Sequence, residues 1–270
     1  MSHPFPTISP LDAIVTAGGI PVQGDPLFER TAGKPKALID FAGKPMIQWV
    51  LDALSASSNV NRVVIVGLPP FTDLVCGHPL KIIETQGSIL SNLKAGVQEL
   101  QHQGNISQKV LALSSDIPAV TGEMVDWVVE KVHQTDHDLY YNVINRDTME
   151  SAFPTSKRTY LKLSEVEVCG GDVNAFDHQM IFQKQQLFDQ IIGSRKSPIK
   201  QATILGFDTL FLVLIRKMTL LQAEVNISKK IGARCHAILC PFAEIGMDVD
   251  KPHQLDELLA YFRSPKVSRN

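Results

Sequence analysis

Short apolar runs alternate with helical patterns along the first half of this chain. Three runs have the length and composition of buried strands: residues 13–15, 62–66 and 109–113. Three segments repeat apolar residues at the spacing of one helix face: residues 46–54, 89–100 and 124–132. Thr121 precedes the last of these segments and can cap its helix. This alternation predicts βαβ units, a largely parallel sheet, and ligand binding beyond the carboxyl ends of its strands.

The second half of the chain is less regular. Two strands and a helix are predicted there, at residues 140–144, 235–239 and 206–231. Residues 151–168 are predicted to be extended and exposed, because the alternation at residues 160–164 suits an antiparallel strand with one solvent-exposed face. The sequence contains no Ser/Gly linker, internal repeat or low-complexity tract. We therefore expect a single domain over residues 10–262.

The composition is that of a soluble globular protein, with 44% hydrophobic and 20% charged residues in 270. A net charge of −2 gives no electrostatic basis for binding nucleic acid or a membrane. The first ten residues are polar and Pro-rich, unlike a signal peptide, and the apolar stretch at 210–215 is too short to span a bilayer. The four cysteines lack C-x-x-C spacing, which favours neither zinc nor disulfides. These features favour a cytoplasmic protein.

His133 and His137 have the i,i+4 spacing of two ligands on one helix face. The zinc-binding H-E-x-x-H motif requires a glutamate directly after the first histidine, where this chain has Gln134. The spacing therefore predicts two solvent-exposed helix histidines rather than metal ligands.

Gly18 and Gly19 stand directly after the first predicted strand. A glycine pair at this place lets backbone N–H groups approach a phosphate closely, and Lys34 and Lys36 follow with mobile positive charge. The segment is not a P-loop, because neither G-x-x-x-x-G-K-[ST] nor G-x-G-x-x-G occurs in the chain. Taken alone, the glycine pair also suits a simple tight turn. The lysines make the segment a candidate site for a nucleoside triphosphate.

Three motifs stand close together in this region: Ala17-Gly18-Gly19, Pro35-Lys36-Ala37-Leu38 and Gly43-Lys44-Pro45-Met46. Together they resemble the signature of nucleotidyltransferases that share the sugar-nucleotide pyrophosphorylase fold, a superfamily that includes molybdenum-cofactor guanylyltransferase-like proteins. The resemblance implies a Rossmann-like three-layer α/β/α fold with a mainly parallel mixed sheet, of the GT-A-like type. It also implies magnesium-dependent transfer of a nucleoside monophosphate from a triphosphate to a small phosphorylated acceptor, such as a sugar phosphate, with release of pyrophosphate.

The resemblance assigns four residues to the triphosphate: Ala17, Gly18, Gly19 and Lys36. Lys36 is also assigned a catalytic role, because its charge would stabilise the transition state. In the family an arginine follows the glycine pair at short spacing, whereas this chain has a longer loop at residues 20–31, with Arg30 near its end. Arg30 either takes the catalytic role of that arginine or is a solvent-exposed loop charge.

Asp116 follows a predicted buried strand and stands just before a turn. A carboxylate at this place can hold a magnesium ion, which prefers one or two carboxylates with phosphate oxygens and water, or it can satisfy N–H groups of the turn. The segment Ser115-Asp116-Ile117-Pro118 resembles the D-x-P motif of the family, which implies that Asp116 binds the metal.

Asp248 and Asp250 are two residues apart, so in an extended segment both side chains lie on one face. The segment from Asp248 to Leu255 resembles the D-I-D-T-P-E-D-L segment that often ends the family's domain, with Lys251 and Gln254 in place of Thr and Asp. The match implies that Asp250 is the second metal ligand and that Asp248 is a ligand or supports one. The alternative is an acidic start to the final helix, favoured by the helix dipole.

Two glycine-containing segments complete the predicted site. Gly87 and Ser88 precede the helix predicted from residue 89, where the family reads the nucleobase, although Gly-Ser before a helix is also common as a simple cap. In the Gly170–Asn174 segment, Asp172 and Asn174 offer donors and acceptors for a hydroxylated acceptor, or form a Gly-Asp turn.

The resemblance divides the domain into a nucleotide-binding half (about residues 10–135), an acceptor-side section (136–235) and a return segment with the second metal carboxylate (236–262). Two other functions remain open. The segment Asp248-Val249-Asp250 is formally the D-x-D of a GT-A glycosyltransferase that uses a nucleotide sugar, although it lies close to the carboxyl terminus. The chain could also be a non-catalytic nucleotide- or sugar-binding module. An α/β protein of this size is often a homodimer.

Overall fold

The computed structural model describes residues 8–31, 33–183 and 217–264. In these residues nine strands form one mixed sheet, and two short strands form a separate hairpin, β2 (Asp40–Phe41) with β3 (Lys44–Pro45). The order across the large sheet is β5 (Leu80–Ile83), β4 (Val60–Val66), β1 (Leu11–Thr16), β6 (Lys109–Ser114), β10 (Val173–Asp177), β7 (Leu139–Asn145), β9 (Glu167–Gly170) and β8 (Leu161–Lys162). Strand β11 (Cys235–Cys240) pairs with β7 at an edge.

Most strands of the large sheet run in the same direction, so their carboxyl ends lie at one edge of the sheet. Strands β5, β4, β1 and β6 are mutually parallel, and β11 is parallel to β7. Strand β10 is antiparallel to both β6 and β7, so β7 runs in the same direction as β6. The carboxyl ends of β1, β6, β7 and β11 therefore lie at the same edge of the sheet, as the βαβ pattern predicts for a ligand site.

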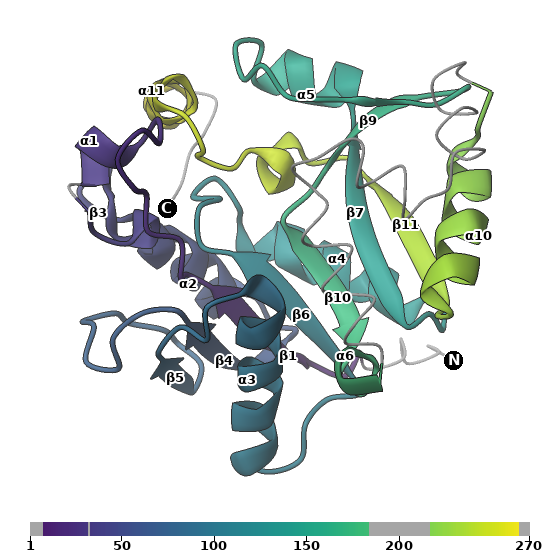
Figure 1. The fold of residues 1–270 in the computed structure, drawn as a ribbon, viewed down its shortest axis with the longest axis horizontal. Coiled ribbons are helices and arrows are strands. Elements are labelled where there is room, and N and C mark those ends of the chain that lie inside the picture. Colours follow the sequence, from purple (N-terminus) through teal and green to yellow (C-terminus); the bar gives the residue numbers. More distant parts are fainter. Residues whose placement is uncertain (1–7, 32, 184–216, 265–270) are drawn as a thin grey trace, which may run out of the picture.

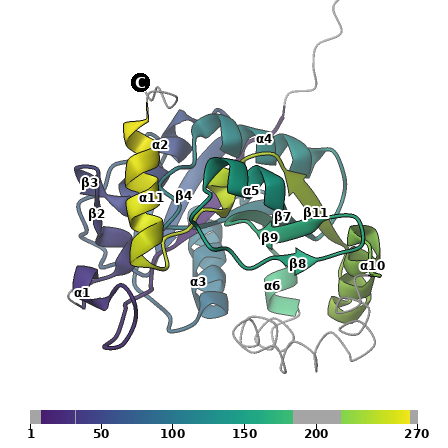
Figure 2. The same cartoon turned by 90° about the horizontal axis from the view of Figure 1, so that it is seen from above.

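Helices cover both faces of the sheet, which confirms the expected three-layer α/β/α fold. On one side lie α2 (Met46–Ala56) and α4 (Gly122–His133), and on the other lie α3 (Ile89–His102), α6 (Met180–Gln183) and α10 (Leu220–Ile231) (Figures 1 and 2). A hydrophobic core lies on each face of the sheet, and successive side chains of β1 point to opposite faces. Ala13 and Val15 therefore pack in one core and Ile14 packs in the other. The remaining short helices and turns are α1 (Phe28–Thr31), α5 (Arg146–Ala152), α11 (Pro252–Arg263) and the 3₁₀ turns Lys36–Leu38 and Ala243–Gly246.

Side-chain caps fix where the central helices begin. The hydroxyl of Ser88 accepts a hydrogen bond from Ser91 N (3.0 Å), and that of Thr121 accepts one from Met124 N (3.4 Å). Each bond satisfies a backbone donor that a helix amino terminus leaves without an intrahelical partner. Both caps confirm the predicted starts of α3 and α4.

The second half departs from the sequence prediction in two places. Of the residues predicted to be extended, Ser151 and Ala152 instead end helix α5, which Asn145 caps by accepting a hydrogen bond from Asp147 N (2.9 Å). Of the helix predicted at 206–231, residues 206–216 lie outside the described residues, and helix α10 begins only at Leu220. The predicted antiparallel pair is present, because β8 pairs with β9.

The prediction of two exposed helix histidines is confirmed for His133 and wrong for His137, because only His133 lies in a helix. Helix α4 ends at His133, whose Nε2 lies 2.9 Å from Ser9 O, and His137 lies in the turn before β7. The buried Tyr140 holds this turn, because its hydroxyl donates to Thr135 O (2.5 Å) and accepts from His137 N (2.9 Å). The side chain of His137 stacks on His236, with 4.8 Å between the ring centroids.

A buried ion pair lies near the amino end of β1, at the opposite edge of the sheet from the predicted site. Asp12 is fully buried, and its carboxylate accepts from Arg62 Nε (2.9 Å) and Nη2 (2.7 Å), Asn61 Nδ2 (3.0 Å) and Ser107 N (2.9 Å). Every bond to this carboxylate offsets part of the cost of burying its charge.

Replacing Arg62 by methionine should destabilise the protein by about 3–5 kcal/mol, because it leaves the buried Asp12 without its cation. The double variant Asp12→Asn with Arg62→Met should recover part of this loss, since no buried charge is then unpaired. Urea denaturation followed by circular dichroism measures both. A single variant as stable as the wild type would contradict the structural role of the pair.

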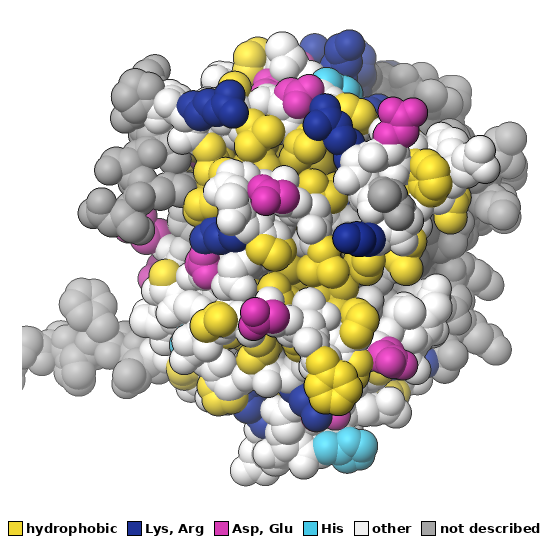
Figure 3. Space-filling view, turned by 90° about the vertical axis from the view of Figure 1, so that its left-hand side faces the viewer, with side chains coloured by type: hydrophobic (Ala, Val, Ile, Leu, Met, Phe, Trp, Pro, Cys, Tyr) yellow, Lys and Arg dark blue, Asp and Glu magenta, His cyan; other side chains and the backbone are white. Residues whose placement is uncertain are grey.

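No described helix is long and apolar enough to cross a membrane. The face that carries α1, β3 and β5, turned toward the viewer in Figure 3, shows hydrophobic side chains among interspersed positive and negative ones. A face on which charges of both signs alternate offers little long-range attraction to a polyanion.

Candidate active site

The loop after β1 is tightly packed at Gly18 and open at Gly19. A Cβ on Gly18 would lie 2.9 Å from Thr85 Oγ1 and 3.2 Å from Asn92 Nδ2, whereas one on Gly19 would meet nothing within 4 Å. Gly67, at the end of β4, has φ +126°, and a Cβ there would lie 2.1 Å from Gly18 N. Gly18 is therefore fixed by its neighbours, and Gly19 leaves open space beside the loop.

Lys36 is brought against this loop by its own backbone. Lys36 N donates to Gly19 O (2.9 Å), which joins the 3₁₀ turn at Lys36–Leu38 to the glycine pair. The ammonium group then forms ion pairs with Asp116 and with Asp250, the latter at 2.7 Å. Three segments that are far apart in the sequence thus meet at one lysine.

Three carboxylates converge at the end of β6. One oxygen from each of Asp116, Asp248 and Asp250 lies within 4.8 Å of those of the other two. Asp116 is only 4% exposed, and Ser114 Oγ donates a hydrogen bond to it. The return segment is held in place by Val249 N, which donates to Asp116 O (3.0 Å). The side chains that the sequence predicts as metal ligands are therefore neighbours in the fold.

The start of α11 sets the direction of Asp250. Gln254 Oε1 accepts hydrogen bonds from Asp250 N (2.9 Å) and Lys251 N (2.8 Å), so a side chain one turn into the helix satisfies the backbone at its start. Gln254, which stands where the family often has aspartate, thus has a defined structural role.

Two cations balance most of the negative charge of the carboxylate cluster. Burial by itself would lower the pKa of Lys36, but the carboxylates of Asp116 and Asp250 outweigh it and hold this pKa above its ordinary value. The guanidinium of Arg158 pairs with Asp248. Lys36 therefore stays protonated, and in this structure its ammonium lies where a metal cation shared by Asp116 and Asp250 would compete with it.

The donor set of this cluster fits a magnesium ion. All three side chains present hard oxygen atoms, and the exposed carboxylate of Asp250 leaves the cluster open to solvent on one side. Magnesium usually takes one or two carboxylates and completes its shell with water and substrate phosphates, which such an open cluster permits.

Asp172 lies beside the same cluster. Its backbone carbonyl accepts from Ser114 N (3.0 Å), and its N–H donates to Ile245 O (2.9 Å). Desolvation, followed by the negative charge of Asp116, raises the pKa of Asp172 to about 7. This side chain, predicted to contact the acceptor, is therefore close enough to the carboxylates to feel their charge.

Asn174 is held by the backbone around it. Its Oδ1 accepts from Asn142 N (2.8 Å), and its Nδ2 donates to Gly171 O (2.9 Å). These bonds join β10 to β7 and to the β9–β10 turn, so they give Asn174 a structural task. Its role toward an acceptor stays a prediction.

The segment predicted to read the base flanks the glycine loop. Asn92 Oδ1 accepts from Gln86 N (2.7 Å), while Gly87 adopts φ +85° with open space around its Cα. Ser88 caps α3 through Ser91 N. The segment is thus fixed by α3 and presents open backbone at Gly87, next to the residues that pack on Gly18.

Arg30 is not brought to the carboxylates by an ion pair. It lies on the short helix α1 with an exposed side chain, and it pairs with no acidic residue in the part of the chain that the structure describes. Its catalytic role stays a prediction.

Sequence reasoning missed several residues that shape the site. Arg158 neutralises Asp248, Ser114 binds Asp116, and Asn92 fixes the segment beside Gly18. None belongs to a motif, and only the fold brings each to its partner. A sequence signal exists for Ser114 alone, since it is adjacent to the D-x-P segment.

Residues 13–190 match the family model described as the MobA-like NTP transferase domain. The matched range includes the glycine loop, Lys36 and Asp116 and covers well over half of the chain. The chain belongs to this family. It is a nucleotidyltransferase-type protein, and the superfamily expected from its motifs is confirmed. No protein with a curated description matches it significantly in sequence.

Solved structures of related fold cover nearly the whole chain. A hypothetical transferase from Thermus thermophilus is 32% identical, with a TM-score of 0.78 over 91% of this chain and 99% of that one. CMP:2-keto-3-deoxy-manno-octonic acid synthetase in complex with CTP is 16% identical, with a TM-score of 0.54 over 94% and 98%. 2-C-methyl-D-erythritol 4-phosphate cytidylyltransferase, also from Thermus thermophilus, is 14% identical, with a TM-score of 0.52 over 94% and 100%. The last two show likeness of fold alone.

Proposed function

We propose that this member of the family transfers a nucleoside monophosphate from a triphosphate to a small phosphorylated acceptor, with release of pyrophosphate. The observation that carries the proposal is the meeting of Lys36 with Asp116 and Asp250 directly beside the open backbone at Gly19. A cation and two carboxylates at a glycine loop are the groups needed to bind a polyphosphate together with a metal ion.

In this proposal Asp116 and Asp250 hold magnesium, and Asp248 is a third ligand or supports the other two. Bound magnesium would neutralise charge on the triphosphate and on the leaving pyrophosphate. Backbone N–H groups near Gly18 and Gly19 would hold phosphate oxygens, and the ammonium group of Lys36 would bind the triphosphate. An oxygen of the acceptor attacks the α-phosphorus in line, its bond to phosphorus forms, and the bond to pyrophosphate breaks.

Little covalent chemistry falls to the protein in such a reaction. Positioning and stabilisation of charge supply most of the acceleration. Gly87 and Ser88 would lie against the base, and Asp172 would face the acceptor. Two of the structural neighbours are described as binding CTP or as a cytidylyltransferase, but at 16% and 14% identity they set no base preference for this chain.

Replacing Lys36 by methionine should reduce pyrophosphate release roughly 10²–10³-fold, because it removes a positive charge aimed at the transition state and keeps most of the side-chain volume. Lys81→Met is the matched control, since Lys81 is exposed on the edge strand β5 and has no place in the predicted site. Circular dichroism establishes that both variants are folded. Equal activity of Lys36→Met and Lys81→Met would overturn the role of Lys36.

The nature of the ligand separates this function from the two alternatives. A GT-A glycosyltransferase would bind or hydrolyse a nucleoside diphosphate sugar and not a free triphosphate. A binding module would bind nucleotide without any turnover. Pyrophosphate release from a triphosphate, dependent on magnesium and on a sugar-phosphate or related acceptor, is the outcome that the proposal requires.

A further inference from the structure

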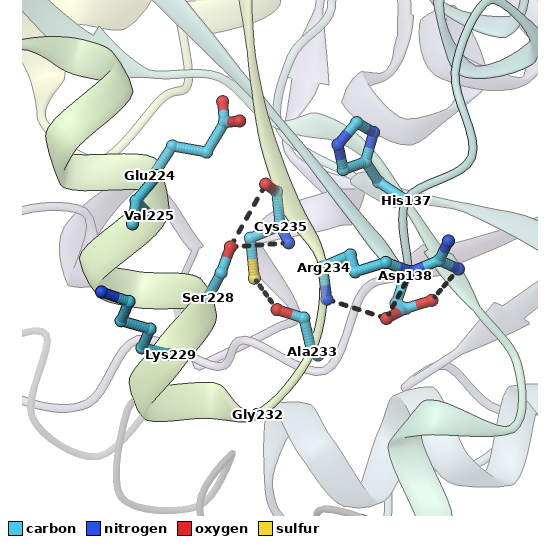
Figure 4. Close-up of a pocket in the computed structure, with 10 residues that line it drawn as sticks. All are labelled: His137, Asp138, Glu224, Val225, Ser228, Lys229, Gly232, Ala233, Arg234 and Cys235. Carbon is cyan, nitrogen blue, oxygen red and sulfur yellow. Dashed lines mark hydrogen bonds and ion pairs between the residues drawn. The ribbon is translucent and has the colours of Figure 1, made fainter.

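A second cluster of metal-binding side chains lies at the amino ends of β7 and β11. His137 comes from the turn before β7, His236 is the second residue of β11, and Glu224 comes from α10. One ligand atom of each lies within 4.8 Å of those of the other two. His137 and Glu224 also line a cavity of about 470 Å³, and Figure 4 shows them reaching toward the start of β11 from two sides.

The spacing inside this cluster suits one small cation. His236 Nδ1 and Glu224 Oε2 are 3.1 Å apart. Two ligands that bind a tetrahedral zinc ion at about 2.0–2.1 Å lie about 3.3 Å from each other. A zinc ion could therefore take the place of the proton between these two atoms. A shift of the His137 ring by about 1–2 Å would then bring it close enough to be the third ligand.

Neighbouring groups orient two of the three side chains, His137 and Glu224. Thr135 Oγ1 lies 3.0 Å from His137 Nδ1, which directs the opposite nitrogen of that ring away from the turn. The hydroxyl of Tyr140 fixes the turn itself through His137 N. Ala237 N, on the edge strand, donates to Glu224 Oε2 (2.9 Å). Partners of this kind accompany metal ligands in proteins, where they set ring orientation and basicity.

The charges around the cluster permit a cation. Glu224 brings a carboxylate to the two imidazoles, and its Oε2 lies 3.1 Å from His236 Nδ1. Arg234, which also lines the cavity, is engaged by Asp136 (2.8 Å) and Asp138 (2.7 Å).

We propose that His137, Glu224 and His236 bind one divalent transition-metal ion of the zinc class. Two imidazoles and one carboxylate form a donor set that such ions take, whereas magnesium prefers oxygen ligands alone. A fourth position would open toward the cavity and hold water. Because Glu224 comes from α10 and both histidines come from the β7–β11 edge, the ion would fasten this helix to the sheet.

This site is separate from the one proposed for nucleotidyl transfer. It lies at the amino ends of the strands, whereas Asp116 follows the carboxyl end of β6. The ion would therefore take no part in nucleotidyl transfer and would hold α10 against the sheet, and the inference does not depend on the proposed function.

The metal-stripped full-length protein should be titrated with Zn²⁺ by calorimetry, in millimolar Mg²⁺ so that the carboxylate cluster is already occupied. We expect one equivalent of Zn²⁺ to bind and to raise the melting temperature. In the double variant His137→Ala with His236→Ala, the affinity should fall at least 100-fold, and the rise in melting temperature should disappear.

Two controls give the result its meaning. His133→Ala removes the neighbouring exposed histidine and should leave the titration unchanged, and Asp116→Asn should also keep the equivalent of Zn²⁺ bound. Glu224→Gln preserves the shape of the side chain and should weaken binding without unfolding the protein. The proposal is overturned if wild type binds no Zn²⁺ under these conditions, or if the double variant binds it as tightly as wild type.

Discussion

Replacing Asp116 by asparagine is expected to lower pyrophosphate release by about 10³-fold, the largest catalytic loss of any single change in the site. The side chain is 6% exposed, contacts Lys36, and lies with Asp248 and Asp250 in one cluster, so it is the most enclosed of the three carboxylates. Asparagine keeps the shape and the hydrogen bond from Ser114 but removes the negative charge that a metal ion and Lys36 both require.

The measurement is magnesium-dependent pyrophosphate release with a panel of sugar phosphates as acceptors. Asp136→Asn serves as the control, because that aspartate is exposed and pairs with Arg234 at the amino ends of β7 and β11, whereas the carboxylate cluster lies at the carboxyl end of β6. Far-ultraviolet circular dichroism should be unchanged in both variants. If Asp116→Asn retained more than about a tenth of wild-type activity, Asp116 could not be the principal metal ligand.

Replacing Gly67 by alanine is expected to cost at least about 3 kcal/mol of unfolding free energy and to abolish nucleotide binding by the folded fraction. The added Cβ would stand 2.1 Å from Gly18 N, 2.4 Å from Gly18 Cα and 2.6 Å from Ala17 C, all of them backbone atoms. Relief of these contacts requires the glycine loop itself to move. Gly67 also has φ +126°, which alanine adopts only with strain.

Gly104→Ala separates the strain from the clash. Gly104 has nearly the same φ, +131°, but a Cβ there meets nothing within 4 Å. It should therefore lose only about 1–2 kcal/mol, the cost of the backbone conformation. Urea denaturation measures the unfolding free energy of both variants. If Gly67→Ala is recovered only as insoluble protein, that result counts as the larger loss of stability. Equal unfolding free energies for both variants would show that the packing of Gly67 on Gly18 is unimportant.

The sequence was sufficient for the architecture of the first half because local signals agree with one another there. Strand β6 lies at its predicted place, and the caps at Ser88 and Thr121 begin α3 and α4 as expected. Hydrophobic periodicity, helix caps and strand length depend on residues that are close together in the sequence, so they can be recognised without the tertiary structure.

The second half was less predictable because its elements depend on tertiary contacts. Helix α5 runs into the start of the segment predicted to be extended from residue 151, and Asn145 caps it by accepting a hydrogen bond from Asp147 N. His137 leaves the helical pattern because Tyr140, buried on β7, holds the preceding turn. Such a contact gives no local sequence signal, so i,i+4 spacing alone misplaced this histidine.

In the site, motifs identified the residues that begin or end elements, but not those that support them. The A-G-G, P-K-A-L and D-x-P segments drew attention to Gly18, Lys36 and Asp116, which the fold brings close together. The partners Arg158 and Gly67 could not be inferred, because each acts through one contact with a residue far along the chain. Their importance follows from packing rather than from any pattern.

The most direct test of the metal-dependent triphosphate site, on which the proposed transfer depends, is equilibrium binding of ATP, GTP, CTP and UTP, each with and without magnesium, to wild type and to Asp116→Asn. We predict that wild type binds one of these triphosphates in a magnesium-dependent manner and that the melting temperature rises with it. Asp116→Asn should lose the magnesium dependence, whereas Asp136→Asn should behave like wild type. Failure of all four triphosphates to bind wild type in the presence of magnesium would contradict the proposed function.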